Sequence, residues 1–183
     1  MDETTLIHKI IKGDTASFRY LYRLYATSAW QLAISICRHQ ANAEEAVQNS
    51  FISAYKYIHT FKFESSFKTW LLRIVFNESI RIQKKEKSYK WEEFDSSENN
   101  NASITIDGSS LLQQKETREQ VAKVMATLNE KESVVLNLFY IEELSVKEVA
   151  AVLGYSEANV KVLLHRARKN FKVQFEHSNL AVS

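Results

Sequence analysis

Proline is absent from this chain of 183 residues, although an average sequence of this length carries roughly nine. Glycine occurs only three times, at Gly13, Gly108 and Gly154. Because proline and glycine mark most turns, their scarcity indicates helices joined by few, short breaks. No segment shows a sustained strand alternation, so we expect an all-α protein.

Other absences exclude whole classes of protein. The single cysteine, Cys37, excludes a disulfide framework and a multi-cysteine zinc site. The isolated glycines exclude a glycine-rich phosphate loop. No apolar run approaches the roughly twenty residues that span a bilayer, and the acidic N-terminus lacks a signal-peptide pattern. Cys37 and His39 do not face one another on a helix, and no nucleophile–base pair is visible. We therefore expect a cytoplasmic protein that is not an enzyme and has no cofactor, metal or small-molecule substrate.

The net charge of +2 conceals a strong internal division. Residues 62–90 carry +5 and residues 150–183 carry +3, whereas residues 91–119 between them carry −5. Basic blocks are typical of nucleic-acid contacts. The alternation of sign also suggests the hypothesis that the two ends of the chain close against each other, or around a partner.

Composition divides the chain into two small helical domains. The first spans residues 1–87 and the second residues 111–175, followed by a tail at 176–183. Residues 88–110 are rich in serine, asparagine and acid and have no apolar period, so we interpret them as a flexible linker. A long surface loop within one domain is the less favoured alternative, because such loops are uncommon in compact domains.

The first domain is predicted to hold four helices. The first ends near Gly13, Asp14 caps the second, and Asn42 caps the third. The fourth begins near Phe67, after a break at residues 61–65.

The second domain contains the signals of a helix-turn-helix. After a helix over residues 112–128, Asn129 is predicted to cap the next one. Ser145 and Glu148 form a capping box, Gly154 supplies a left-handed helix end, and Ser156 caps the last helix. A short helix, a glycine turn and a new cap are the sequence elements of a helix-turn-helix.

The last helix carries a basic face. Residues 161–172 hold five basic side chains and no acid, and such a helix fits the major groove of DNA. A solvated basic face on an ordinary helical hairpin is the alternative, and we favour DNA binding. Lys161 and His165 are the best candidates for base edges, and Arg166, Arg168 and Lys169 for phosphates. The full predicted set is Ser156, Asn159, Lys161, Val162, His165, Arg166, Arg168 and Lys169.

Residues 55–70 interleave aromatic and basic side chains, as in proteins that stack single-stranded bases on rings. Composition leaves this reading and simple core packing about equally open. Phe67 and Trp70 lie on an apolar helix face, which favours the core. Phe61, Phe63 and the serines at 65 and 66 fall in the break, where we expect exposure.

Taken together, these segments resemble a bacterial RNA polymerase sigma factor of the extracytoplasmic-function (ECF) group of the sigma-70 family. Sigma region two is matched by KGDTASFRYLYRLY (12–25), NAEEAVQNSFISAYKYI (42–58) and FKFESSFKTWLLRIVFN (61–77). Sigma region four is matched by residues 128–171, which include the helix-turn-helix. The resemblance covers nearly the whole chain except the linker and the last residues. Asn49, Arg81 and Leu163 differ from residues that the family often has there.

The resemblance implies a transcription initiation factor that binds core RNA polymerase and directs it to promoter DNA. The last helix would read the −35 element, and the loop of residues 61–67 would hold a flipped base of the −10 element. An anti-sigma factor, often membrane-anchored, is a further implied partner. The implied polymerase contacts are Glu44, Glu45, Gln48 and Phe51. The implied −10 contacts are Phe61, Phe63, Ser65, Ser66, Phe67, Lys68, Arg73 and Asn77.

Two rival functions remain open from the sequence. One is a helix-turn-helix regulator that binds duplex DNA without being a polymerase subunit. The other is a helical adaptor that binds only protein. The aromatic loop argues against the first, and the basic recognition face argues against the second.

Overall fold

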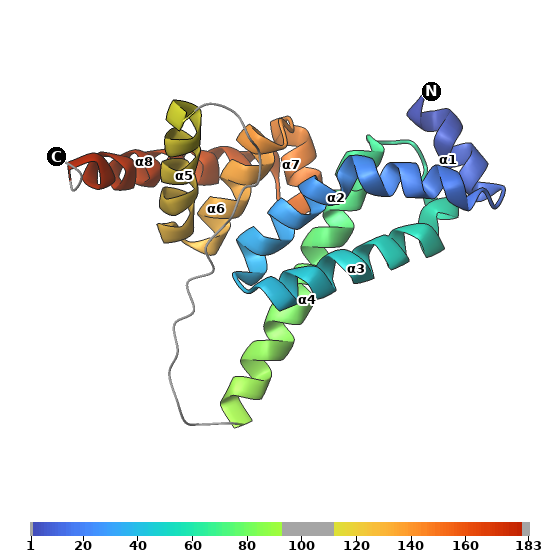
Figure 1. Cartoon of the computed structure of the whole chain (residues 1–183), viewed down its shortest axis with the longest axis horizontal. Helices are drawn as coiled ribbons and strands as arrows, with labels where there is room; N and C mark the ends of the chain where they lie inside the picture. Colours follow the sequence, from blue (N-terminus) through green and yellow to red (C-terminus); the bar gives the residue numbers. More distant parts are fainter. Residues whose placement is uncertain (1, 93–111, 181–183) are drawn as a thin grey trace.

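The computed structural model describes residues 2–92 and 112–180, and within them it is all-α (Figure 1). The N-terminal unit contains α1 (Glu3–Ile11), α2 (Thr15–Cys37), α3 (Gln40–Tyr57), the short turn η1 (Ile58–Thr60) and α4 (Phe67–Glu92). The C-terminal unit contains α5 (Leu112–Thr127), α6 (Glu130–Leu136), the π-helical turn η2 (Asn137–Ile141), α7 (Val146–Leu153) and α8 (Glu157–Leu180). The predicted fold class is confirmed.

The N-terminal unit is built on α2, α3 and α4, which pack pairwise, with α1 across α2. Its core includes Leu21, Ile36, Phe67 and Leu71, all fully buried. Asp14 caps α2 as predicted, because its carboxylate accepts hydrogen bonds from the backbone N–H groups of Ala16 and Ser17.

The predicted start of α3 is wrong, and two other helices extend beyond the predicted domain bounds. The N-cap of α3 is His39, so Asn42 lies inside the helix, where its side chain donates to Glu86 across the contact with α4. The last helix of the N-terminal unit continues to Glu92, so the first residues of the predicted linker are helical. Its remainder, from residue 93, lies outside the described residues. Helix α8 continues through Leu180 and so includes residues 176–180 of the predicted tail.

The C-terminal unit packs α8 against α5, α6 and α7. Asn129 caps α6 through the N–H of Glu132, as predicted. The π-helical turn η2 was not predicted. It ends at Glu142, and the next residue, Glu143, is in the left-handed region with a φ of 55°. This tight reversal places the Glu142 side chain against the N-terminal unit.

The two units are in contact. In this closed arrangement α7 packs against α4, and α6 packs against α2 (Figure 1). Arg38 ends α2 in the left-handed conformation and donates to the carbonyl oxygens of Ala126 (3.2 Å) and Leu128 (2.5 Å) at the end of α5. Gln83 of α4 donates to Glu130 of α6 at 2.6 Å. Closure therefore uses direct helix packing and specific polar contacts, whereas the charge pattern had suggested a role for the acidic block 91–119.

Candidate nucleic-acid interface

The helix-turn-helix forms through the caps that the sequence predicted. The side chain of Glu148 accepts from both the N–H and the hydroxyl of Ser145, and the Ser145 hydroxyl accepts from the N–H of Glu148. Gly154 ends α7 with a φ of 69°, which an L side chain rarely adopts. Ser156 then accepts from the N–H of Asn159 at 3.2 Å and starts α8. These local bonds fix the angle at which α8 leaves α7.

The face of α8 opposite the core is open and basic. Val160, Leu164 and Ala167 are buried against the rest of the unit. All eight predicted recognition residues are exposed, namely Ser156, Asn159, Lys161, Val162, His165, Arg166, Arg168 and Lys169. This helix can therefore present its side chains to a groove without rearrangement of its core.

Arg168 has partners within the unit that sequence reasoning missed. Its Nε donates to the hydroxyl of Tyr140 at 2.7 Å, and its guanidinium lies 5.5 Å from the ring centre of Phe139 and 5.6 Å from that of Tyr140. Stacking of this kind holds a guanidinium plane in one orientation. Arg168 is thus positioned by η2, whereas its predicted phosphate contact remains a prediction.

The loop between η1 and α4 is only partly exposed. Phe63, Ser65 and Ser66 are exposed, as expected. Phe61 and Phe67 are buried at 7% and 0% exposure, and their rings pack against each other and against Trp70. The expected exposure of Phe61 is therefore wrong, and Phe67 lies in the core, as its apolar helix face predicted. The implied contacts of both residues with the −10 element stay predictions.

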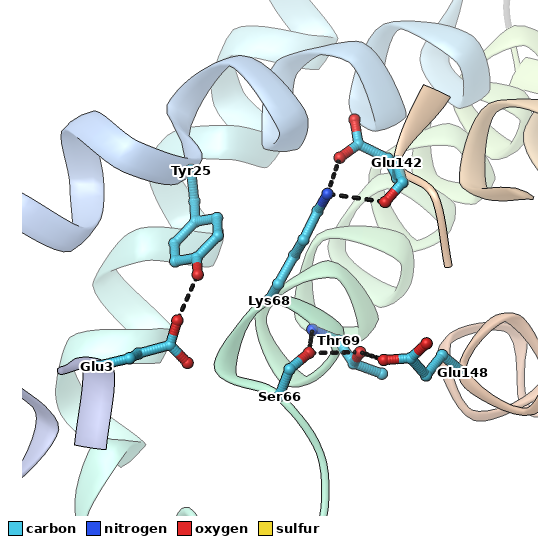
Figure 2. Close-up of polar contacts among 7 residues, drawn as sticks. All are labelled: Glu3, Tyr25, Ser66, Lys68, Thr69, Glu142 and Glu148. Atoms are coloured by element: carbon cyan, nitrogen blue, oxygen red, sulfur yellow. Dashed lines mark hydrogen bonds and ion pairs between the residues drawn. The ribbon is translucent and has the colours of Figure 1, made fainter. Parts of the chain in front are cut away.

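Two acidic side chains of the C-terminal unit contact the start of α4 (Figure 2). Lys68 Nζ donates to the carboxylate and to the backbone oxygen of Glu142, both at 2.8 Å. The Glu142 side chain is 2% exposed and that of Lys68 is 27% exposed. Thr69 bonds Glu148 at 3.2 Å and the hydroxyl of Ser66 at 2.8 Å. The closed arrangement therefore occupies Lys68, a predicted −10 contact, whereas the Ser66 hydroxyl bonds Thr69 of its own unit.

The same contact affects the ionisation of Glu148. Partial burial raises its pKa, but hydrogen bonds from Ser145 and Thr69, together with the charge of Lys68, outweigh burial and leave the pKa below its ordinary value. This carboxylate is consequently held in its charged form while it caps α7 and bonds α4.

The opposite side of the loop is bonded to α1. Glu3 accepts from the N–H of Phe67 at 3.1 Å. It also accepts from the hydroxyl of Tyr25 at 2.5 Å (Figure 2). Burial first, then the hydrogen bond and the negative charge of Glu3, raise the pKa of Tyr25 above its ordinary value. No sequence pattern predicts this group, because its members lie far apart in the chain.

Farther along α4, Arg73 and Asn77 are exposed one turn apart, and their implied contacts with the DNA strand stay predictions. Arg81 follows one turn later and forms an ion pair with Glu78 at 2.7 Å. The three side chains share one helix face, and this face continues the polar surface of the loop.

The predicted polymerase contacts lie on α3. Glu44, Glu45 and Gln48 are exposed. Phe51 is instead a core residue at 5% exposure, packed against the rings of Phe18 and Tyr22. Its implied contact with the polymerase stays a prediction. Ile52, one residue later, is 66% exposed and lies one turn beyond Gln48, where an apolar contact is available.

Nothing in the described part of the chain groups three or more metal-ligating side chains. Cys37 is buried, and burial raises the pKa of its thiol to about 11. Within the same residues, no helix is both long and apolar enough to cross a membrane.

Both units of this chain are similar to known proteins. The family model for Sigma-70 region 2 matches residues 21–89, and the model for Sigma-70, region 4 matches residues 118–171. The ECF RNA polymerase sigma factor SigW of Bacillus subtilis is 30% identical over 175 residues, which cover 92% of this chain and 94% of SigW. SigM of the same organism is 29% identical over 156 residues, 85% of this chain and 93% of SigM.

Two solved structures share the fold. CnrH, in complex with the cytosolic domain of CnrY, has a TM-score of 0.67 at 21% identity and covers 94% of this chain and 96% of its own. The sigma factor RpoE of Bartonella quintana, in complex with the anti-sigma factor NepR, has a TM-score of 0.65 at 22% identity, with 87% and 96% covered. The identity and coverage of SigW, together with matches to both sigma regions in the expected order, show that this chain belongs to the ECF group of the sigma-70 family of RNA polymerase sigma factors.

Proposed function

We propose that this protein acts in the cytoplasm as a transcription initiation factor, not as an enzyme, and that it binds core RNA polymerase and directs it to promoters. The observation that supports the proposal is the presence of two separate exposed surfaces, the basic face of α8 and the loop before α4 with Arg73 and Asn77, in a chain that resembles SigW over nearly its full length. A regulator that works without polymerase would need only the helix-turn-helix, so this alternative is not favoured.

The C-terminal unit reads the −35 element as duplex DNA. Lys161 and His165 lie on the exposed face of α8, where they reach base edges. Arg166 and Lys169 flank them and neutralise phosphates, and Arg168 does so from its platform on Phe139 and Tyr140.

The N-terminal unit captures an unpaired base of the −10 element. The exposed Phe63 ring offers a stacking surface, and Ser65 and Ser66 bring hydroxyl groups beside it. Lys68, Arg73 and Asn77 follow the strand along α4. Lys68 must exchange Glu142 for a phosphate oxygen, so the closed arrangement has to open before this contact forms.

The partners follow from the same surfaces. The exposed acidic face of α3, with Glu44, Glu45 and Gln48 and the apolar Ile52, contacts the polymerase. An anti-sigma factor is a further partner, since the sigma factor RpoE of the structural comparison was solved with NepR bound. Such a partner could be membrane-anchored.

The test is run-off transcription with purified core polymerase on a pool of genomic promoters. At a promoter found in this way, Lys161→Ala is expected to weaken binding that depends on the −35 duplex, because it removes a base-edge or phosphate contact worth about 1 to 3 kcal/mol. Phe63→Ala is expected to impair strand opening, measured by permanganate reactivity, more than duplex binding. Equal losses in both assays for both variants would contradict this division of labour.

A further inference from the structure

The first helix of the chain reaches across the N-terminal unit to the base-capture loop, residues 61–66. Glu3, in the first turn of α1, uses both carboxylate oxygens. One accepts from the N–H of Phe67, and the other accepts from the hydroxyl of Tyr25 (Figure 2). Phe67 is the first residue of α4, and the first N–H groups of a helix have no partner within it. Glu3 therefore fixes the point at which the loop joins α4.

A second contact of α1 lies at the tip of the loop. Phe63 has a φ of 58°, a left-handed conformation that is uncommon for a bulky residue. Its ring stacks on His8 of α1, with ring centres 5.2 Å apart and an interplanar angle of 13°, and it also contacts Phe61. A strained residue persists only where its surroundings hold it, and here α1 provides one of the two rings that do so.

The first helix, α1, is held against the core by its apolar side chains. Leu6, Ile7 and Ile10 are buried, so the backbone that carries Glu3 and His8 is anchored to the core. The hydroxyl of Tyr25, from α2, orients the Glu3 carboxylate from behind. Tyr25 of α2 thus orients Glu3, and Glu3 in turn positions the start of α4.

We propose that Glu3 is a positioning residue that holds the base-capture loop in the shape needed to receive an unpaired −10 base; this inference rests on the proposed function. Glu3 does not touch DNA, because both of its oxygens face protein donors. Its effect is to remove the entropy cost of ordering the loop when the base arrives. Loss of Glu3 should therefore impair base capture and leave duplex reading by α8 unchanged.

The matched control is Asp2→Asn. Asp2 is the neighbouring residue, is exposed, and makes no side-chain hydrogen bond at the start of α1. The substitution Asp2→Asn removes the same negative charge but breaks no such hydrogen bond. Glu3→Gln keeps one acceptor oxygen and the shape of the side chain, whereas Glu3→Ala removes both bonds.

The first measurement needs no DNA. Amide hydrogen exchange of Phe67 should quicken about tenfold in Glu3→Ala, the factor expected for loss of one hydrogen bond to a charged group. A smaller change is expected in Glu3→Gln and none in Asp2→Asn. An unchanged Phe67 amide in Glu3→Ala would overturn the proposal.

The second measurement uses holoenzyme and a single-stranded oligonucleotide that carries the non-template −10 sequence of a promoter found by run-off transcription. Glu3→Ala should weaken its binding about tenfold, with Glu3→Gln intermediate, while binding of a −35 duplex stays at the wild-type level. Equal losses on both probes would indicate a general structural defect and overturn the proposal. If the wild-type chain directs initiation and both Glu3→Ala and Glu3→Gln bind the −10 strand as well as the wild type, this proposal is overturned and the proposed function stands. Absence of initiation by the wild-type chain would overturn both.

Discussion

Replacement of Glu142 by glutamine is expected to loosen the contact between the two units. The Glu142 side chain is almost fully buried and accepts from Lys68 Nζ at 2.8 Å, across the boundary between η2 and α4. Glutamine has a similar shape but no charge, so it keeps a weak hydrogen bond and loses the ionic attraction. The control is Glu143→Gln, which removes the same charge from the next, exposed residue.

The magnitude follows from the surroundings of the pair. Removal of one partner of a fully buried ion pair costs about 3 to 5 kcal/mol. Here the Lys68 side chain is 27% exposed and keeps its second bond, to the Glu142 backbone oxygen. Water therefore replaces part of the lost interaction. We expect Glu142→Gln to destabilise the closed form by about 1 kcal/mol, which shifts the equilibrium between the closed and open forms about fivefold.

Single-molecule energy transfer measures this balance in the free protein. Dyes attached through His59→Cys in the N-terminal unit and Gln174→Cys in the C-terminal unit, in a Cys37→Ala background, report the separation of the two units; both dye positions are exposed. Glu142→Gln should increase the low-transfer population, and Glu143→Gln should not. Identical populations in the two variants, or an extended wild-type protein at all salt concentrations, would refute the reasoning.

Three smaller predictions concern local features. Gly154→Ala should lower the stability of the helix-turn-helix by about 1 kcal/mol, seen by thermal melting, because the φ of 69° disfavours a side chain. Cys37 should react slowly with a thiol reagent at pH 8 and rapidly after unfolding, because burial raises its pKa to about 11; fast labelling of the native protein would contradict this. Folding lowers the pKa of Glu148, so its ionised carboxylate contributes to stability fully above the ordinary pKa of 4.5, and this contribution is lost as the pH falls further. Glu148→Gln should therefore weaken the loss of stability with falling pH, seen by unfolding measured as a function of pH.

Local signals in the sequence predicted local structure well. The caps at Asn129 and Ser145 join groups three residues apart, and the left-handed Gly154 needs only its own backbone. Such interactions are encoded within one helical turn, so a short segment suffices to recognise them. The predicted start of α3 is wrong because Asn42 resembles a cap in the sequence, but its side chain bonds a residue of α4, 44 positions away.

The finer arrangement of the candidate site depended on tertiary contacts. Phe51 and Ile52 are adjacent and both apolar, and only packing against α2 decides which one is buried. Phe61 lies in a break between helices, where exposure is a reasonable expectation, yet its ring packs under the loop. The bonds of Glu3 to Phe67 and of Lys68 to Glu142 join residues 64 and 74 positions apart. No periodicity or spacing predicts contacts of that range.

The central claim is that this chain directs core RNA polymerase to promoters, and the most direct measurement is run-off transcription with purified core enzyme and sequencing of the RNA 5′ ends. The account predicts starts that depend on the chain and share a −35 and a −10 sequence at a fixed separation. These starts should be lost in a Phe63→Ala, Lys161→Ala double variant, because both DNA surfaces are then impaired. Transcription that is unchanged by addition of the chain, at every promoter in the pool, would contradict the account.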